Sequence, residues 1–169
     1  KDKRFSFEVF DCAKIPHKGC NFDLVIANHV LFYCEDIPAV CNEIQRVLVP
    51  GGKLICSTYG SHHMREVSQL VQDFDNRIVL SADRLYERFG RENGADILAP
   101  YFSDISWESY NDSLLVPDAE PLISYILSCH GNQNQYLLDK YTDFRGFVSR
   151  KTKDGFFITK DAGIFLCEK

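Results

Sequence analysis

The most constraining feature of the sequence is a strand, helix and strand pattern within residues 22–60. Residues 22–30 (FDLVIANHV) form a near-continuous apolar run, which is typical of a strand covered on both faces. From Asp36 to Leu48 apolar residues recur every three or four positions, which predicts a helix with one apolar stripe. Asp36 is placed to cap this helix, and residues 50–52 (PGG) to end it. Residues 53–58 (KLICST) then predict a second strand.

Short links between these elements imply a right-handed crossover and a parallel sheet. The expected fold class is therefore α/β, with a Rossmann-like, mostly parallel sheet, helices on both faces and an antiparallel C-terminal strand. The same reasoning predicts further strands at residues 5–10 and 104–115, and helices at 64–74, 80–89, 118–129 and 135–150. Residues 156–169 are predicted to form a hairpin that turns at residues 160–163 (KDAG).

Composition narrows the function classes. The net charge of −5 disfavours a surface that neutralises nucleic-acid phosphates, so a small-molecule substrate is expected and nucleic acid is not. No apolar stretch approaches the roughly 20 residues that span a bilayer, and the first residues lack a signal-peptide pattern, so no membrane association is expected. The seven cysteines show no C-x-x-C spacing and are interpreted as reduced thiols of a soluble, cytoplasmic protein.

Residues 22–60 also resemble one family. A strand that opens in FDLV, a polar residue at its end, an E-I-x-R-V-L helix and P-G-G before the next strand are similar to class I S-adenosylmethionine-dependent methyltransferases. Within that superfamily the stretch is most similar to the ubiquinone and menaquinone methyltransferase group. Residues 7–23 resemble the family's third strand and its loop, and residues 154–169 resemble its closing seventh strand. The resemblance implies the sheet order 3-2-1-4-5-7-6 and S-adenosylmethionine as cofactor.

The resemblance implies a set of cofactor-binding residues. Asp11 and Cys12 would contact adenine, the backbone at Asn28 would face the methionine part, and His29 and Tyr33 would line the cofactor or the methyl-transfer channel. Each has a structural alternative, because Asp11 could cap its own turn, Asn28 could satisfy a buried turn and His29 could simply pack at the strand end.

The sequence lacks two N-terminal features of the family pattern. No glycine-rich turn follows a strand, and no second strand ends in a ribose-binding acid. Residues 51–52 and Gly60 are interpreted as a helix stop and a turn after a strand. We therefore expect an N-terminally incomplete methyltransferase domain that by itself binds the cofactor weakly or not at all. Its strand at residues 5–10 would lack a neighbour, and such edges invite pairing with another chain, so a homodimer is one expected outcome.

Methyl transfer from a sulfonium needs alignment more than acid–base groups. If the acceptor requires a base, His29 and His62 are the candidates, and no metal site is expected because the adjacent residues His62 and His63 lack a spaced third ligand. The domain prediction is a single methyltransferase-like domain over residues 1–169 with a substrate cap around residues 61–130. The alternatives are a non-catalytic module with this fold and a nicotinamide-dependent oxidoreductase, which the lack of G-x-G-x-x-G disfavours.

Overall fold

The computed structural model describes residues 2–81 and 84–169, and the chain divides into two compact units. Unit 1 comprises Lys1–Thr58, Arg88–Glu108 and Gly163–Lys169, and unit 2 comprises Tyr59–Glu87 and Ser109–Ala162. Each unit therefore collects segments that are far apart in the sequence. Two long strands contribute residues to both units, which explains why each unit is assembled from several parts of the chain.

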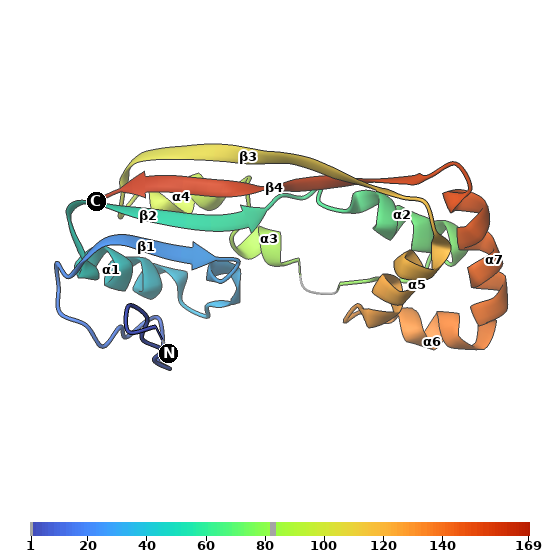
Figure 1. Ribbon diagram of the computed structural model, residues 1–169, viewed down its shortest axis with the longest axis horizontal. Helices are drawn as coiled ribbons and strands as arrows, with labels where there is room; N and C mark the ends of the chain where they lie inside the picture. The colour runs from blue at the N-terminus through green and yellow to red at the C-terminus, as the bar shows by residue number, and fades with distance from the viewer. Residues whose placement is uncertain (1, 82–83) are drawn as a thin grey trace. The chain divides into compact units, whose positions relative to one another are not determined.

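The strands form one mixed sheet in the order β1 (Phe22–Asn28), β2 (Leu48–Tyr59), β4 (Phe156–Glu168) and β3 (Ser103–Val116) (Figure 1). The strands β1 and β2 are parallel, with Ala27 opposite Cys56. Strand β4 runs antiparallel to β2, because Lys169 N–H donates to Gly52 O at 3.0 Å and Gly60 N–H donates to Asp161 O at 2.8 Å. The expected α/β class and the antiparallel C-terminal strand are confirmed, and the order matches the 4-5-7-6 part of the implied family order.

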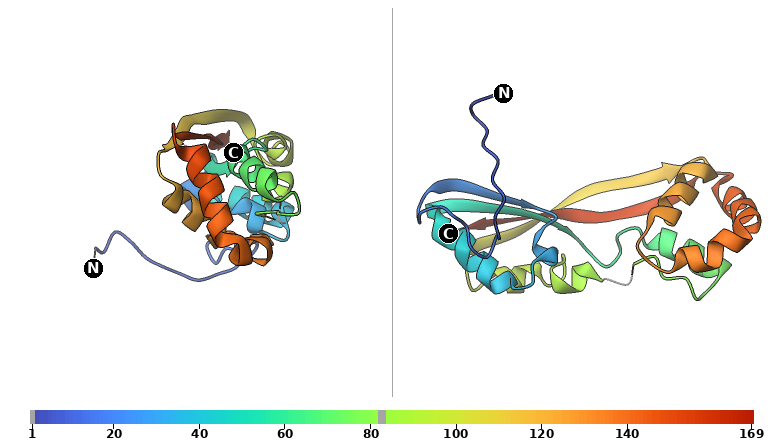
Figure 2. Two further views of the ribbon diagram at one scale, coloured as in Figure 1. Left: turned by 90° about the vertical axis from the view of Figure 1, so that its right-hand side faces the viewer. Right: turned by 90° about the horizontal axis from the view of Figure 1, so that it is seen from below.

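In unit 1 the helix α1 (Ile37–Val47) packs its apolar stripe against the sheet. The Asp36 carboxylate caps it by accepting the Ala39 N–H at 2.9 Å, as the sequence predicts. The short helix α4 (Gly94–Leu98), which the sequence did not predict, lies on the same side of the sheet as α1 (Figure 2). The opposite face of β1 stays exposed at Leu24 (45%) and Ile26 (58%), so the described residues cover this strand on one face and not on both.

Unit 2 gathers its helices around one apolar core. These are α2 (Arg65–Phe74), α5 (Ala119–Ser128), α6 (Gln133–Leu137) and α7 (Tyr141–Thr152), and Figure 2 shows α5, α6 and α7 packed together. Helix α2 repeats apolar residues at the predicted spacing and buries Val67, Leu70 and Val71. The core also takes residues from the segment after α2, from β4 and from the later helices: Ile78, Leu80, Leu122, Ile123, Ile126, Leu137, Phe144, Val148 and Ile158.

The predicted strand at residues 5–10 is wrong. These residues have no regular secondary structure, and Phe7 and Val9 are almost fully exposed. A strand is stabilised by hydrogen bonds to a neighbour, and none of the described strands pairs with this segment. The apolar pattern of the segment is real, but without a partner strand it forms no ladder.

The predicted hairpin at residues 156–169 is also wrong, because these residues form the single strand β4. Gly163 was expected in a turn, yet it lies where β4 meets β3. A Cβ built on Gly163 would stand 2.3 Å from Glu108 O and 2.6 Å from Trp107 Cζ2. Gly163 therefore allows close approach of two strands, which is the second common use of glycine within a strand.

Two predicted helices are shorter than expected. In residues 80–89 only α3 (Leu85–Arg88) is helical, and residues 82–83 of that prediction lie outside the described residues. The predicted helix at residues 135–150 is divided into α6, the 3-10 turn η2 (Leu138–Lys140) and α7. Helix α1 ends before the PGG sequence, which lies within the early part of β2 instead of forming a separate stop.

Glu66, in the first turn of α2, ties this helix to β4. Its Oε2 accepts the Thr159 N–H at 2.9 Å and its Oε1 accepts the Thr159 hydroxyl at 2.6 Å. Burial raises the pKa of Glu66, but the bonds from Thr159, a backbone N–H and Arg65 outweigh it and lower the pKa from 4.5 to about 2. The ionised carboxylate is therefore stabilised in the folded state.

This lowered pKa predicts a pH-dependent effect of Glu66→Gln. The ionised group stabilises the fold above about pH 4.5, and this contribution is lost as the pH falls towards about 2. At pH 7 the variant should lower the free energy of unfolding by about 2 kcal/mol, and the difference should shrink at pH 3. Urea denaturation at both pH values measures it. Glu87→Gln, whose exposed partner is Arg84, should cost less than about 0.5 kcal/mol, and a Glu66→Gln effect that is independent of pH would contradict the assignment.

Candidate functional site

The carboxyl end of β1 holds Asn28 and His29 in a defined turn. His29 has a left-handed backbone (φ 47°), and its N–H donates to Ser57 Oγ on β2 at 3.0 Å. The Ser57 hydroxyl in turn lies 3.5 Å from Asn28 Oδ1. Histidine tolerates this conformation only when its surroundings fix it, and Ser57 supplies that constraint. The two predicted residues thus lie together where open α/β sheets present ligand contacts.

The Asp11–Cys12 segment lies beside the 3-10 turn η1 (Leu31–Tyr33) that follows β1. Cys12 Sγ is 3.5 Å from Sγ of Cys34, the residue that ends this turn. Burial, together with the neighbouring Cys12 thiol, raises the pKa of Cys34 to about 11, so this thiol is protonated at neutral pH. The structure therefore brings the loop of Asp11 and Cys12 next to the segment that follows Asn28 and His29.

Asp11 caps its own turn, which is one of the two interpretations that the sequence left open. Its Oδ1 accepts the Ala13 N–H at 2.9 Å and its carbonyl accepts the Lys14 N–H at 2.8 Å, so it does cap its own turn. The side chain is exposed, and among the described residues Oδ2 has no hydrogen-bond partner. A free carboxylate oxygen fits the exocyclic amino group of adenine, so the turn and the implied cofactor contact are compatible.

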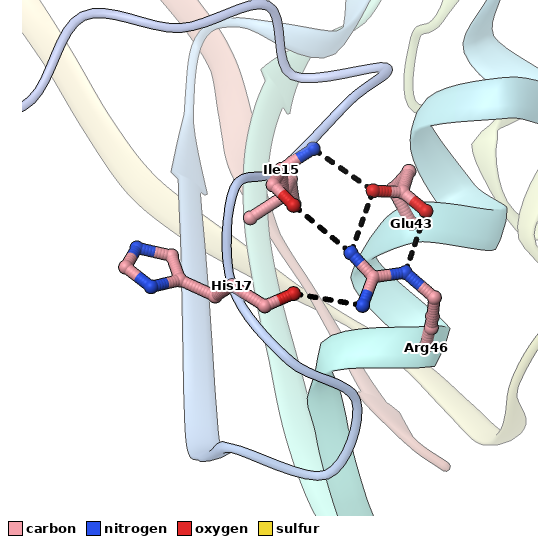
Figure 3. Close-up of polar contacts among 4 residues, drawn as sticks. All are labelled: Ile15, His17, Glu43 and Arg46. Carbon is pink, nitrogen blue, oxygen red and sulfur yellow. Dashed lines mark hydrogen bonds and ion pairs between the residues drawn. The ribbon is translucent and has the colours of Figure 1, made fainter.

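A pair of charged residues on α1 holds this loop in place, and the sequence did not single it out (Figure 3). Arg46 donates from Nη1 to His17 O at 2.8 Å and from Nη2 to Ile15 O at 3.0 Å. Glu43 Oε2 accepts the Ile15 N–H at 2.8 Å, and Glu43 also pairs with Arg46 at 2.7 Å. The hydrogen bond from Arg46 lowers the pKa of Glu43. The E-I-x-R motif was the available signal, because its two charges lie one helical turn apart.

Several aromatic side chains of unit 1, including the predicted Tyr33, pack against neighbouring rings. Tyr33 is 65% exposed and packs its ring edge against Phe32 at 4.7 Å between centroids. Trp107 packs on Phe165 at 4.8 Å. The His17 ring contacts Phe22 at 5.1 Å. Tyr33 remains a proposal as a cofactor contact, while the half-buried Trp107 packs against the buried Phe165.

Unit 2 contains a cavity of about 580 Å³ between the end of β2, helix α2, the segment after α2 and helix α5. Tyr59, the last residue of β2, lies at its wall, with its ring 5.2 Å from His63 and 6.3 Å from Tyr86. His63 lines the cavity, whereas His62 does not and offers its backbone N–H to Asp161 Oδ2 at 3.4 Å. His29 lies in unit 1 and His62 in unit 2. The volume suits a small organic molecule.

Within residues 2–81 and 84–169, no three histidine, cysteine or acidic side chains are grouped so that they could hold a metal ion. Among the helices described, none combines the length and apolarity needed to cross a bilayer.

Comparisons with known proteins bear on the same segments. The family described as "Methyltransferase domain" matches residues 1–56. The biotin biosynthesis bifunctional protein BioHC of Saccharophagus degradans is 32% identical over 78 residues, which are 46% of this chain and 14% of that protein. A malonyl-acyl-carrier-protein O-methyltransferase of Methylovorus is 31% identical over 71 residues, which are 42% of this chain and 24% of that protein. The chain thus spans a quarter or less of the length of these relatives.

The fold comparison covers the rest of the chain. The structure of the YcgJ protein of Bacillus subtilis superimposes with a TM-score of 0.53 and 12% identity, and covers 94% of this chain and 68% of that one. At this identity the likeness concerns the fold alone. Residues 1–56 are therefore similar to a methyltransferase domain, while the narrower resemblance to the ubiquinone and menaquinone group is not confirmed.

Proposed function

We propose that this relative of the class I methyltransferases is part of an enzyme that transfers a methyl group from S-adenosylmethionine to a small-molecule acceptor. The observation that carries the proposal is the turn of Asn28 and His29 at the carboxyl end of β1, which Ser57 of β2 holds by hydrogen bonds. Asn28 and His29 lie inside the segment that matches the methyltransferase domain. Unit 1 would contribute to cofactor binding, and the cavity of unit 2 would bind the acceptor.

The cofactor supplies an activated methyl group on a sulfonium, so the protein mainly binds and aligns. In this proposal the free Asp11 oxygen accepts from the adenine amino group, and the backbone at Asn28 and His29 faces the methionine part. Glu43 and Arg46 act as positioning residues, because they hold the loop that follows Asp11 and Cys12. If the acceptor must lose a proton, His29 remains a proposed base. His62 is a weaker candidate, because it does not line the cavity proposed for the acceptor.

The two alternative functions are a non-catalytic module with this fold and a nicotinamide-dependent oxidoreductase. A non-catalytic module would keep the fold without binding the cofactor. The oxidoreductase alternative gains no support, because the paired glycines 51–52 lie within β2 and do not form a turn between a strand and a helix.

Titration of S-adenosylhomocysteine by calorimetry tests the proposed function. We expect Asp11→Asn to weaken binding by about tenfold or more, since a charge-assisted hydrogen bond contributes about 1.5–3 kcal/mol. Arg46→Ala should weaken binding as well, because the loop of residues 15–17 loses its hydrogen bonds to Arg46. Asp143→Asn, on the exposed first turn of α7, should leave it unchanged. Absence of binding by the full-length protein would favour the non-catalytic module.

A further inference from the structure

We propose that the cavity of unit 2 selects an organic anion, namely a small molecule with a flat apolar body and a carboxylate that Arg65 binds. That this molecule is the methyl acceptor rests on the proposed function, whereas its binding to the cavity does not. The inference depends on three features of the cavity: the sign of its charge, the hydrogen-bonding state of Arg65 and the composition of its floor.

The charged side chains that line the cavity are of one sign. Arg65 and Arg84 line it, and no described aspartate or glutamate does. The chain as a whole carries a net charge of −5, so this local excess of positive charge runs against the overall balance. Two guanidinium groups, with no carboxylate among the described residues that line the cavity, favour an anion over a cation.

The Arg65 guanidinium group has one hydrogen bond to a neighbouring side chain and further N–H donors that a ligand can use. Its Nε lies 3.3 Å from Glu66 Oε1, whereas its terminal nitrogens make no hydrogen bond to any described residue. Glu66 is meanwhile engaged by the hydroxyl and N–H of Thr159 at 2.6 and 2.9 Å, which are the shorter contacts. Two terminal N–H groups on one guanidinium match the geometry of a carboxylate, so Arg65 can bind a ligand in a bidentate manner.

Arg84 is expected to contribute less than Arg65 to binding the ligand carboxylate. Its Nη1 donates to Glu87 Oε1 at 3.0 Å, and both side chains are more than half exposed. Arg65 is also the first residue of α2, a ten-residue helix whose N-terminal end adds a positive potential. Arg65 is therefore the group that would hold the carboxylate, and Arg84 would add to the field.

The floor of the cavity is apolar and its wall aromatic. Val67, Val71 and Ile78 are fully or almost fully buried and face the cavity from the core of unit 2. The rings of Tyr59 and Tyr86 stand at the wall, 6.3 Å apart and inclined by 63°. Apolar floor and ring faces suit a flat apolar body, and the guanidinium at the edge fixes its orientation.

A matched pair of ligands tests this inference. Binding of 2-naphthoate and of its neutral analogue 2-naphthamide is measured by ligand-observed NMR or calorimetry, without any methyl donor. We expect the carboxylate to bind at least about tenfold more tightly than the amide. Arg65→Gln should reduce this preference to less than about threefold. Arg150→Gln removes the same charge from α7, away from the cavity, and should preserve the preference.

A second variant tests whether both ligands bind inside the cavity, independently of the charge of Arg65. Ser68 lines the cavity from an exposed position on α2, so Ser68→Trp should fill the space without disturbing the core and should abolish binding of both ligands. Equal affinity for the two ligands, or a preference that survives Arg65→Gln, would overturn the inference. Because no cofactor is present, these outcomes are independent of S-adenosylhomocysteine binding, so the failure of this inference and of the proposed function can be told apart.

Discussion

Replacing Gly131 by alanine is expected to lower the free energy of unfolding of unit 2 by more than about 3 kcal/mol. A Cβ at this position would lie 1.8 Å from Val79 O, 2.6 Å from Leu80 C and 2.7 Å from Leu80 O. All three are backbone atoms, so a change of side-chain rotamer cannot relieve the overlap. Chemical denaturation followed by circular dichroism measures the loss.

The backbone that Gly131 approaches is also fixed by its neighbour Asn132. The Asn132 N–H donates to Val79 O at 3.0 Å, its Oδ1 accepts the Val79 N–H at 2.7 Å and its Nδ2 donates to Arg77 O at 3.0 Å. Moving residues 77–80 away from a new methyl group would stretch these three bonds. The backbone therefore cannot relieve the overlap without weakening these hydrogen bonds.

Gly146 offers the matched control, because it lies inside α7 and nothing closer than Arg150 Nη1, at 3.6 Å, would meet its Cβ. Gly146→Ala should stabilise the protein by about 0.5–1 kcal/mol through helix propensity. The same substitution should thus act in opposite directions at the two positions. Similar effects at Gly131 and Gly146 would show that the close approach at Gly131 is not what the structure indicates.

In unit 1 we expect Gly94→Ala to destabilise by about 2–3 kcal/mol and Phe165→Ala by about 3–5 kcal/mol. A Cβ on Gly94 would lie 2.4 Å from Phe165 Cε2. The Phe165 ring is 1% exposed and is held by Trp107 at 4.8 Å and Phe89 at 5.9 Å, so it has little room to move. Urea denaturation of the single variants measures both effects.

The double variant decides whether the two effects share one cause. Once Phe165 is truncated, the methyl group of Gly94→Ala enters the vacated space, so the combined loss should be smaller than the sum of the single losses by about 1 kcal/mol or more. Phe144→Ala, in the core of unit 2, provides a control for simple loss of burial, and it should add to Gly94→Ala without coupling. Additive effects of Gly94→Ala and Phe165→Ala would show that the close approach of Gly94 to the Phe165 ring does not cause the destabilisation.

The sequence by itself determined the strand, helix and strand of residues 22–60. Their apolar spacing, the Asp36 cap and the short connections act between near neighbours in the chain, so the pattern specifies them directly. The same local signals predicted α2, α5 and β3. The resemblance to the methyltransferases drew attention to Asn28 and His29, which lie at the end of the predicted first strand of this pattern.

Tertiary structure alone decided the features that depend on partners distant in the sequence. Residues 5–10 have a strand pattern but no neighbouring strand, and Gly163 serves the approach of β3 to β4 where the local sequence predicted a turn. The contacts of Arg46 with the loop of residues 15–17 and the one-sided charge of the cavity arise from residues brought together only by folding. Periodicity reports which face of an element is apolar, but the partner that covers this face is chosen by the packing of the whole chain.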